Sequence, residues 1–198
     1  MSEQSLLLLA RMIGLTGLGL LIFSGIGGVV MSSRFSARLS RSFRWLKAAR
    51  VFRSHRILSL VGASLFLLHP IPTLFAQKTT GGLSLQQMLV PFTASDQTLW
   101  IGLGTLAFYV LIIVAVSSLL MKHMKFSHWR TLHYGTYLLL GLGLAHGLFI
   151  SAEYKPGEHF QPWEPEKFIL LLMATIVLGF PIWRVLAKQR RFRGENGG

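Results

Sequence analysis

Four histidines lie within or beside long apolar runs, where an ionisable side chain is costly and usually functional. The stretch HRILSLVGASLFLLH carries His55 and His69, 14 residues apart, and HYGTYLLLGLGLAH carries His133 and His146, 13 residues apart. At a rise of about 1.5 Å per residue, the histidines of each stretch are separated by about 20 Å along a helix. If the two helices run parallel, the four imidazoles form two pairs at two levels, His55 with His133 and His69 with His146.

Two imidazoles that face each other in a dry helix bundle suit the axial positions of a haem iron, with the apolar macrocycle between the helices. Zinc usually requires four ligands in a tighter cluster. The sequence contains no cysteine, which excludes thiolate metal sites and the covalent attachment of c-type haem. A histidine-lined ion or metal transporter without haem is the alternative from a different functional class.

The elements that must position these histidines are membrane helices. Hydrophobic residues make up 52% of the chain and charged residues 14%, and the charges collect between apolar runs. A bilayer core of about 30 Å needs about 20 helical residues. The sequence therefore predicts an all-α, polytopic transmembrane bundle, a single domain over residues 1–198. We expect about five spans: Leu6–Val30, Ile57–Ala76, Leu99–Met121, Leu132–Ala152 and Phe168–Ala187.

The distribution of charge predicts the orientation of these spans. The net charge is +13, and the basic residues concentrate in the first connection (Arg34 to Arg56), in the third (Lys122, Lys125 and Arg130) and after the fifth span. The positive-inside rule then puts the N-terminus outside and the C-terminus in the cytoplasm. The His55/His133 level becomes the inner one, and the His69/His146 level the outer one. Membrane lipid, and not nucleic acid, is the partner expected for these charges.

His133 and His146 would not lie on the same face of one ideal helix, because 13 residues turn by about 220°. A distortion near GLGLAHG, or a different approach angle of each ring, would reconcile the spacing. Gly62, Gly141 and Gly143 lie between the histidines and leave room for a flat macrocycle or for close helix contact. The remaining histidines, His123, His128 and His159, are expected in solvated loops.

The connections are expected to be simple. SSRFSARLSRSFRWLKAARVFRS predicts an amphipathic helix on the inner leaflet. On the outer side, QKTTGGLSLQQMLVPFTASDQT and EYKPGEHFQPWEPEK predict polar loops. Tryptophans are expected at the two interfaces: Trp100 and Trp163 outside, with Trp45, Trp129 and Trp183 inside. The segment MSEQSLLLLAR lacks the basic region of a cleaved signal, so we expect a retained first helix.

HRILSLVGASLFLLHP, followed by WRTLHYGTYLLLGLGLAH, resembles the ferric reductase-like transmembrane domain. Ferric reductases, NADPH oxidases and the haem-binding membrane subunit of the periplasmic methionine sulfoxide reductase system share this domain. The resemblance covers nearly the whole chain and implies two b-type haems, with His55, His69, His133 and His146 as the axial ligands of the iron. The opening RMIGLTGLG resembles the first-helix motif of the family, whose arginine lies near the outer haem and corresponds to Arg11. Snorkelling to the outer interface is the alternative role of Arg11.

The resemblance implies a bis-haem b cytochrome that carries electrons outward across a bacterial cytoplasmic membrane. Oxidases and eukaryotic ferric reductases continue into a flavin and nicotinamide domain, whereas this sequence has no G-x-G-x-x-G on a βαβ pattern. We therefore expect a separate cytoplasmic flavin reductase, or quinol, as the donor. The acceptor is left open between a periplasmic protein, a ferric chelate and oxygen.

One protein with this domain differs from this chain in an informative way. The methionine sulfoxide reductase subunit typically lacks the first histidine of the first stretch, whereas His55 is present here, which favours a two-haem conduit. The alternative within redox proteins is a terminal reductase of ferric chelates or oxygen that acts at the outer haem. Trp129 and Tyr137, from the W-x-x-L-H-x-x-x-Y pattern, are expected to be packing and interface residues.

Overall fold

The computed structural model describes residues 2–32, 48–76, 82–150, 167–177 and 179, and the regular elements within these ranges are helices. The chain divides into two compact units, residues 1–160 and 161–198. The helices of the first unit are α1 (Glu3–Ser32), α3 (Ala48–Leu68), η1 (Ile71–Phe75), α4 (Leu85–Leu89), α5 (Thr98–Leu119), η3 (Met121–His123), α6 (Phe126–His133) and α7 (Gly135–Phe149). In the second unit, the described part contains the apolar helix Lys167–Val177.

Three segments of the described chain are helical, long and apolar enough to cross a membrane: Ser5–Val29, Ala49–Phe75 and Thr98–Leu119. Each exposes large apolar side chains, such as Phe23 (66% exposed) and Leu60 (68% exposed), which suits a lipid environment. The all-helical expectation is thus confirmed, and these helices indicate a multi-pass membrane protein.

The ends of the helices differ from the predicted spans where prolines and arginines intervene. Helix α3 begins at Ala48, nine residues before the predicted start at Ile57, because its arginines lie on exposed positions and permit the helix to continue. It ends at Leu68, and the 3-10 helix η1 replaces the predicted continuation to Ala76. Pro70 and Pro72 cause this change, since proline lacks the N–H that an α-helix requires.

Several predictions fall on residues outside the described ranges. These are most of the amphipathic helix between residues 32 and 54, the outer loop after Ile150, the end of the fifth span, Trp45, Trp163, Trp183 and His159.

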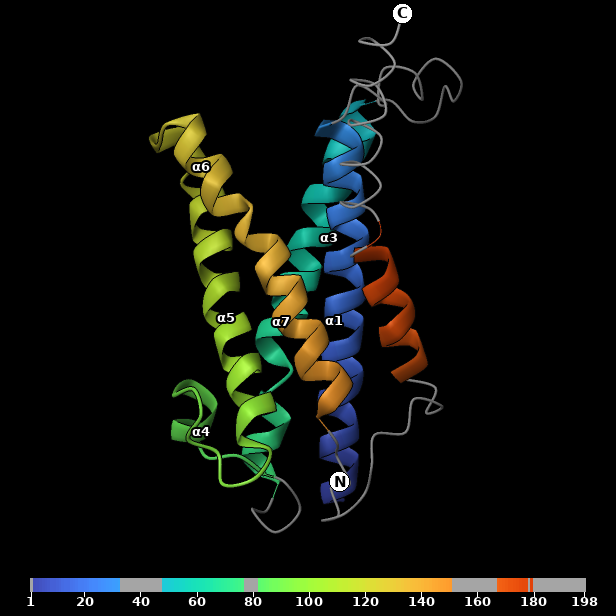
Figure 1. The fold of residues 1–198 in the computed structure, drawn as a ribbon, viewed down its shortest axis with the longest axis vertical. Coiled ribbons are helices and arrows are strands. Elements are labelled where there is room, and N and C mark those ends of the chain that lie inside the picture. The colour runs from blue at the N-terminus through green and yellow to red at the C-terminus, as the bar shows by residue number, and fades with distance from the viewer. Residues whose placement is uncertain (1, 33–47, 77–81, 151–166, 178, 180–198) are drawn as a thin grey trace, which may run out of the picture. The chain divides into compact units, whose positions relative to one another are not determined.

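The first unit is built from two helix pairs, α1 with α3 and α5 with α7, as Figure 1 shows. Glycines bring α1 and α3 together: a Cβ added at Gly17 would lie 2.9 Å from the backbone nitrogen of Phe66, and one at Gly62 would lie 3.1 Å from the carbonyl oxygen of Gly17. Small residues that let backbones approach are typical of membrane helix contacts. Gly62 therefore serves close helix contact, one of the two roles that the sequence left open.

The predicted fourth span is interrupted at Tyr134, where α6 ends and α7 begins. The Thr136 hydroxyl donates a hydrogen bond to the carbonyl oxygen of His133 at 2.7 Å, which satisfies an acceptor at the break. A Cβ at Gly135 would lie 3.3 Å from Val114, so the break also lies close to α5. The expected distortion thus occurs immediately after His133 and not near GLGLAHG, where α7 is continuous.

The first predicted outer loop, between residues 77 and 98, contains the short helix α4. The Ser84 hydroxyl accepts from the backbone N–H of Gln87, and the Gln87 side chain accepts from the backbone N–H of Ser84. This reciprocal capping box is a helix-start signal that was readable in the sequence as S-L-Q-Q. The sequence predicts a polar loop for this stretch, and the structure adds a short helix within it.

Candidate functional site: two histidine pairs

The structure brings the four histidines together in two pairs. The ring centroids of His55 and His133 are 6.3 Å apart, and those of His69 and His146 are 6.2 Å apart. The rings of the two pairs are inclined at 74° and 68°. These pairings require α3 and α6–α7 to run parallel, as the sequence predicts. Each pair joins a histidine of the α1/α3 side to one of the α5/α7 side.

In the His69/His146 pair, both Nδ1 atoms meet main-chain carbonyl oxygens. The acceptor for His69 is Phe66, on the preceding turn of α3, at 2.5 Å. The acceptor for His146 is Trp100, near the start of α5, at 2.8 Å. A carbonyl oxygen can only accept, so each Nδ1 carries the hydrogen and donates it. The lone pair of each ring is therefore on Nε2.

In the His55/His133 pair, serines surround the Nδ1 atoms. His55 Nδ1 lies 2.9 Å from the carbonyl oxygen of Ser24 and 2.8 Å from its hydroxyl oxygen. That hydroxyl is also 2.6 Å from the hydroxyl of Ser59, and it donates to the carbonyl oxygen of His55 at 3.0 Å. Ser24 is only 2% exposed, so this network lies in the core. The carbonyl of Ser24 again assigns the hydrogen to Nδ1 of His55.

His133 has the longest of these contacts. Its Nδ1 lies 3.5 Å from the Ser118 hydroxyl oxygen, at the outer limit for a hydrogen bond. The Ser118 hydroxyl donates its hydrogen to the carbonyl oxygen of Val114 at 2.7 Å, so it can only accept from His133. The carbonyl contacts thus assign the same tautomer to His55, His69 and His146, with Nε2 free of a hydrogen, and the longer Ser118 contact of His133 is in keeping with it.

This tautomer and spacing fit two axial ligands of one metal ion. Metal-binding histidines usually donate the other ring N–H to a carbonyl or a similar acceptor, which fixes the orientation of the ring. A metal ion bound at about 2.0 Å by a nitrogen on either side places two imidazole centroids about 6.2 Å apart, given about 1.1 Å from nitrogen to centroid. The observed 6.3 Å and 6.2 Å agree with this value. The centroid separation at each level therefore agrees with two imidazoles that bind one metal ion from opposite sides.

Glycines make room for three of the four rings. A Cβ at Gly28 would lie 3.2 Å from Cε1 of His55, and a Cβ at Gly14 would lie 3.2 Å from Cδ2 of His69. The tightest place is Gly104 of α5, where a Cβ would lie 2.6 Å from Nδ1 of His146. Sequence reasoning missed these positions, although Gly14 and Gly28 repeat the 14-residue spacing of His55 and His69.

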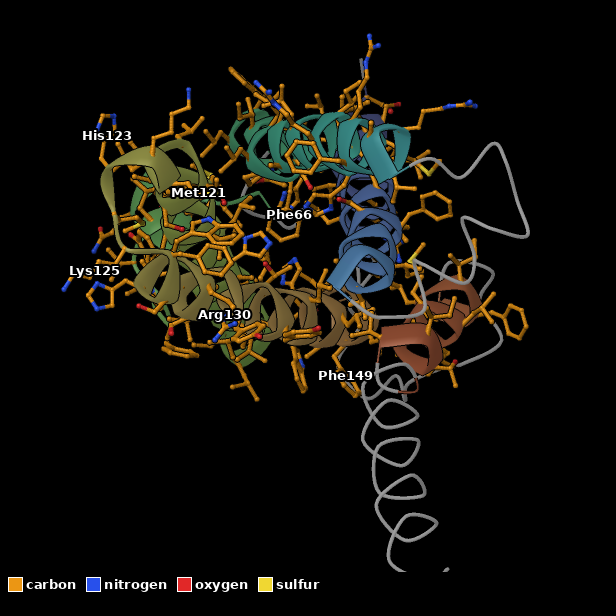
Figure 2. The ribbon with its side chains drawn as sticks, turned by 90° about the horizontal axis from the view of Figure 1, so that it is seen from above. Phe66, Met121, His123, Lys125, Arg130 and Phe149 are labelled. Atoms are coloured by element: carbon orange, nitrogen blue, oxygen red, sulfur yellow. The ribbon has the colours of Figure 1, made fainter. Side chains whose placement is uncertain are left out.

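The glycines chosen from the sequence have other surroundings. A Cβ at Gly143 would lie 3.2 Å from Leu18 and 3.5 Å from Phe66, so this glycine serves helix packing. Gly141 faces open space, with nothing within 4 Å of an added Cβ. Phe66 is 3% exposed, and Figure 2 shows it directed into the space between the helices.

The other predicted residues lie around the two pairs. The ring of Trp129 stacks on that of His133, with centroids 5.0 Å apart and planes inclined at 22°, as expected of a packing residue. Arg11 is half-buried on α1, one turn before Gly14, and its part in a site stays a prediction. Tyr137 is 43% exposed. His123 and His128 are exposed, and Figure 2 shows His123 pointing away from the bundle.

Within the described ranges, no three side chains of His, Cys, Asp or Glu gather in a way that could hold a metal ion, so a zinc-type cluster is not assembled there. Searches against protein-family models, curated proteins and solved structures find no match to the chain. The chemistry proposed for the site therefore rests on its geometry and on the residue types that form it.

Proposed function

We propose that this protein is a bis-haem b membrane cytochrome that carries electrons from a cytoplasmic or quinol donor to an acceptor outside the membrane. The observation that supports this most directly is the pair of bis-histidine levels, with centroid separations of 6.3 Å and 6.2 Å. The resemblance to the ferric reductase-like transmembrane domain implies the same ligands. One-electron transfer is the chemistry that a bound haem would supply at each level.

The protein's own residues would fix the ligands and exclude water. His55 and His133 would hold one haem, and His69 and His146 the other. Carbonyl and hydroxyl acceptors at Nδ1 keep Nε2 available and orient the rings. Between the two levels, the buried side chains are apolar: Leu18, Leu21, Phe66, Leu139, Leu140 and Leu144. This packing keeps the interior dry and the local dielectric low, which influences the redox potential.

With one haem at each level, an electron would cross the membrane in two transfers. Gly14 and Gly28, which contact the two levels, are 14 residues apart, or about 21 Å along α1. Because a bilayer core is about 30 Å thick, one level lies near each face. Electrons could then cross in two stages.

The proposed topology has five spans, with the N-terminus outside the bacterial cytoplasmic membrane and the C-terminus inside. Exposed cations accompany the His55/His133 level: Arg50, Arg53 and Arg56 on α3, and Lys122, Lys125 and Arg130 around α6. Asp96 lies at the opposite end, just before α5. By the positive-inside rule, the His55/His133 level faces the cytoplasm.

The exposed cations would also attract the electron donor. Figure 2 shows Lys125 pointing away from the bundle, where a soluble partner can reach it. If a flavin reductase docks through long-range attraction, its rate of haem reduction should fall as salt rises, because salt screens exposed charges. Reduction that does not depend on salt, or that quinol achieves alone, would contradict docking of this kind.

An optical spectrum tests the proposed function. The purified protein should show a Soret band and, after reduction with dithionite, the α band of a six-coordinate b-type haem, with two haems per chain. As a matched control, the double variant His123→Ala/His128→Ala should keep both haems. Protein without these bands would contradict the cytochrome and favour the histidine-lined transporter. Rapid transfer from the reduced protein alone to ferric chelate or oxygen would instead favour a terminal reductase.

A further inference from the structure

The segment that precedes α5 folds back along that helix. The Thr105 hydroxyl lies 3.2 Å from the carbonyl oxygen of Met88 and 3.1 Å from that of Ile101, so its one hydrogen is shared between them, and the Tyr109 hydroxyl donates to the carbonyl oxygen of Leu89. Thr105 and Tyr109 are 7 and 11 residues beyond Thr98, or about 10 and 16 Å along the axis of α5. Figure 1 shows α4 beside the first turns of α5. The C-terminal end of α4 therefore lies at a depth within the candidate span.

Phe92 packs the same segment against α5. A Cβ at Gly102 would overlap the Phe92 ring, so the glycine provides the notch in which the ring lies. Phe92 has a φ of 63°, a left-handed conformation that is unfavourable for a non-glycine residue. The packing against Gly102 offsets this cost and fixes the turn. Gly104, two residues later, faces the opposite direction and contacts His146.

The segment exposes mainly apolar side chains, with Gln86 and Thr93 as the exposed polar ones. Residues 82–94, GLSLQQMLVPFTA, contain no charged side chain. Leu85, Val90 and Phe92 are 58%, 46% and 48% exposed. In lipid, backbone polar groups must find partners within the protein. The capping box satisfies the start of α4, and Thr105 and Tyr109 bind the Met88 and Leu89 carbonyls at its end.

We propose that residues 84–93 form a re-entrant segment embedded in the membrane, with Leu85, Val90 and Phe92 against lipid acyl chains. The Thr105 and Tyr109 hydroxyls in the first half of α5 have a physical purpose on this account. Water would satisfy the Met88 and Leu89 carbonyls of a solvated loop, whereas acyl chains cannot. The proposal replaces the polar outer loop expected from the sequence, and it requires neither a cofactor nor an assigned orientation of the chain.

Cysteine accessibility tests the proposal, because the native chain contains no cysteine. Single variants Leu85→Cys and Val90→Cys would be reconstituted in vesicles and treated with a charged maleimide on both faces. Ser95→Cys, an exposed position nearer α5, is the matched control. We expect Ser95→Cys to react at least about tenfold faster, because thiolate formation is suppressed in apolar surroundings. Equal rates at the three positions would overturn the proposal.

A depth measurement shows whether lipid or protein covers the segment. A neutral fluorophore on Leu85→Cys or Val90→Cys should be quenched by lipids brominated in mid-chain, and one on Ser95→Cys should not. Slow labelling at Leu85→Cys and Val90→Cys without quenching would mean that protein covers these side chains, which overturns the proposal.

The hydrogen bonds give a second test. Combining Thr105→Val with Tyr109→Phe removes both hydroxyl donors, so the α4 carbonyls should seek water and labelling at Val90→Cys should accelerate several-fold. Thr105→Ser alone retains the hydroxyl and should leave the rate low. An unchanged rate in the double variant would show that these bonds do not keep the segment in the membrane, and would overturn the proposal.

Discussion

The two histidine pairs have the same centroid separation but differ in what fixes their rings. In the His69/His146 pair, both Nδ1 atoms donate to main-chain carbonyls, of Phe66 and Trp100. In the His55/His133 pair, Nδ1 of His55 also meets a carbonyl, that of Ser24, but the hydroxyls of Ser24, Ser59 and Ser118 lie beside the two rings. A side-chain substitution can remove a hydroxyl, whereas it cannot remove a carbonyl. The His55/His133 pair should therefore respond to serine variants, whereas the His69/His146 pair should respond most to a change at Gly104, the tightest of the glycine contacts.

The largest effect is expected at Gly104. A Cβ there would lie 2.6 Å from Nδ1 of His146, so Gly104→Ala should push the ring away from its Trp100 acceptor. We expect the affinity of the His69/His146 level for haem to fall by tenfold or more, by analogy with other disruptions of ligand orientation. Haem quantitation should then give about one haem per chain, since only the His55/His133 level would retain its haem.

Gly141→Ala is the matched control for this variant, because nothing lies within 4 Å of a Cβ at Gly141. It should retain both haems. Full occupancy in Gly104→Ala would contradict the role assigned to this glycine and weaken the contrast between the pairs.

An intermediate effect is expected at Ser24. Ser24→Ala removes the hydroxyl that contacts His55 and Ser59 but keeps the Ser24 carbonyl. Haem should be lost from the His55/His133 level about tenfold faster, the lower end of the range for such outer ligand contacts. The measurement is haem transfer to a soluble scavenging protein, in a His69→Ala background that leaves only this level occupied. Thr16→Ala removes an exposed hydroxyl from the same helix and should change nothing.

The smallest effect is expected at Ser118. Its oxygen is 3.5 Å from Nδ1 of His133, where a hydrogen bond contributes little. In the same transfer assay, Ser118→Ala should accelerate haem loss by less than about threefold. Ser117→Ala is the control for this variant, because it removes a neighbouring hydroxyl that donates to the carbonyl oxygen of Val114 at 2.9 Å. If Ser118→Ala were as severe as Ser24→Ala, the two serines would be equivalent and the ranking within this pair would be wrong.

Features that depend on one element alone were predictable from the sequence. Helix α5 (Thr98–Leu119) agrees with the predicted Leu99–Met121 within two residues, because a continuous apolar run between polar ends determines it. The pairing of His55 with His133 and of His69 with His146 follows from the helical rise and a parallel arrangement. Whether these residues bind haem stays a prediction.

Features that depend on contacts between elements were not predictable in the same way. The break at Tyr134 needs Thr136 to satisfy the His133 carbonyl and Gly135 to approach α5. The sequence does not show that Gly14, Gly28 and Gly104 make space for histidine rings, because these contacts depend on how the helices pack. Helix α4 was not predicted, although its capping box is present in the sequence, because the polar composition around it is typical of a loop.

The most direct measurement of the central claim is haem occupancy in the four single histidine variants. Each histidine would be replaced by alanine, and the haem-to-protein ratio and redox titration of each variant compared with those of the native protein. We expect His69→Ala and His146→Ala to lose the same redox component, and His55→Ala and His133→Ala to lose the other, because each iron would be deprived of one of its two axial ligands. The two double variants within a pair should behave like the corresponding single ones. If His55→Ala instead abolished the component lost in His146→Ala, the proposed pairing of ligands would be contradicted.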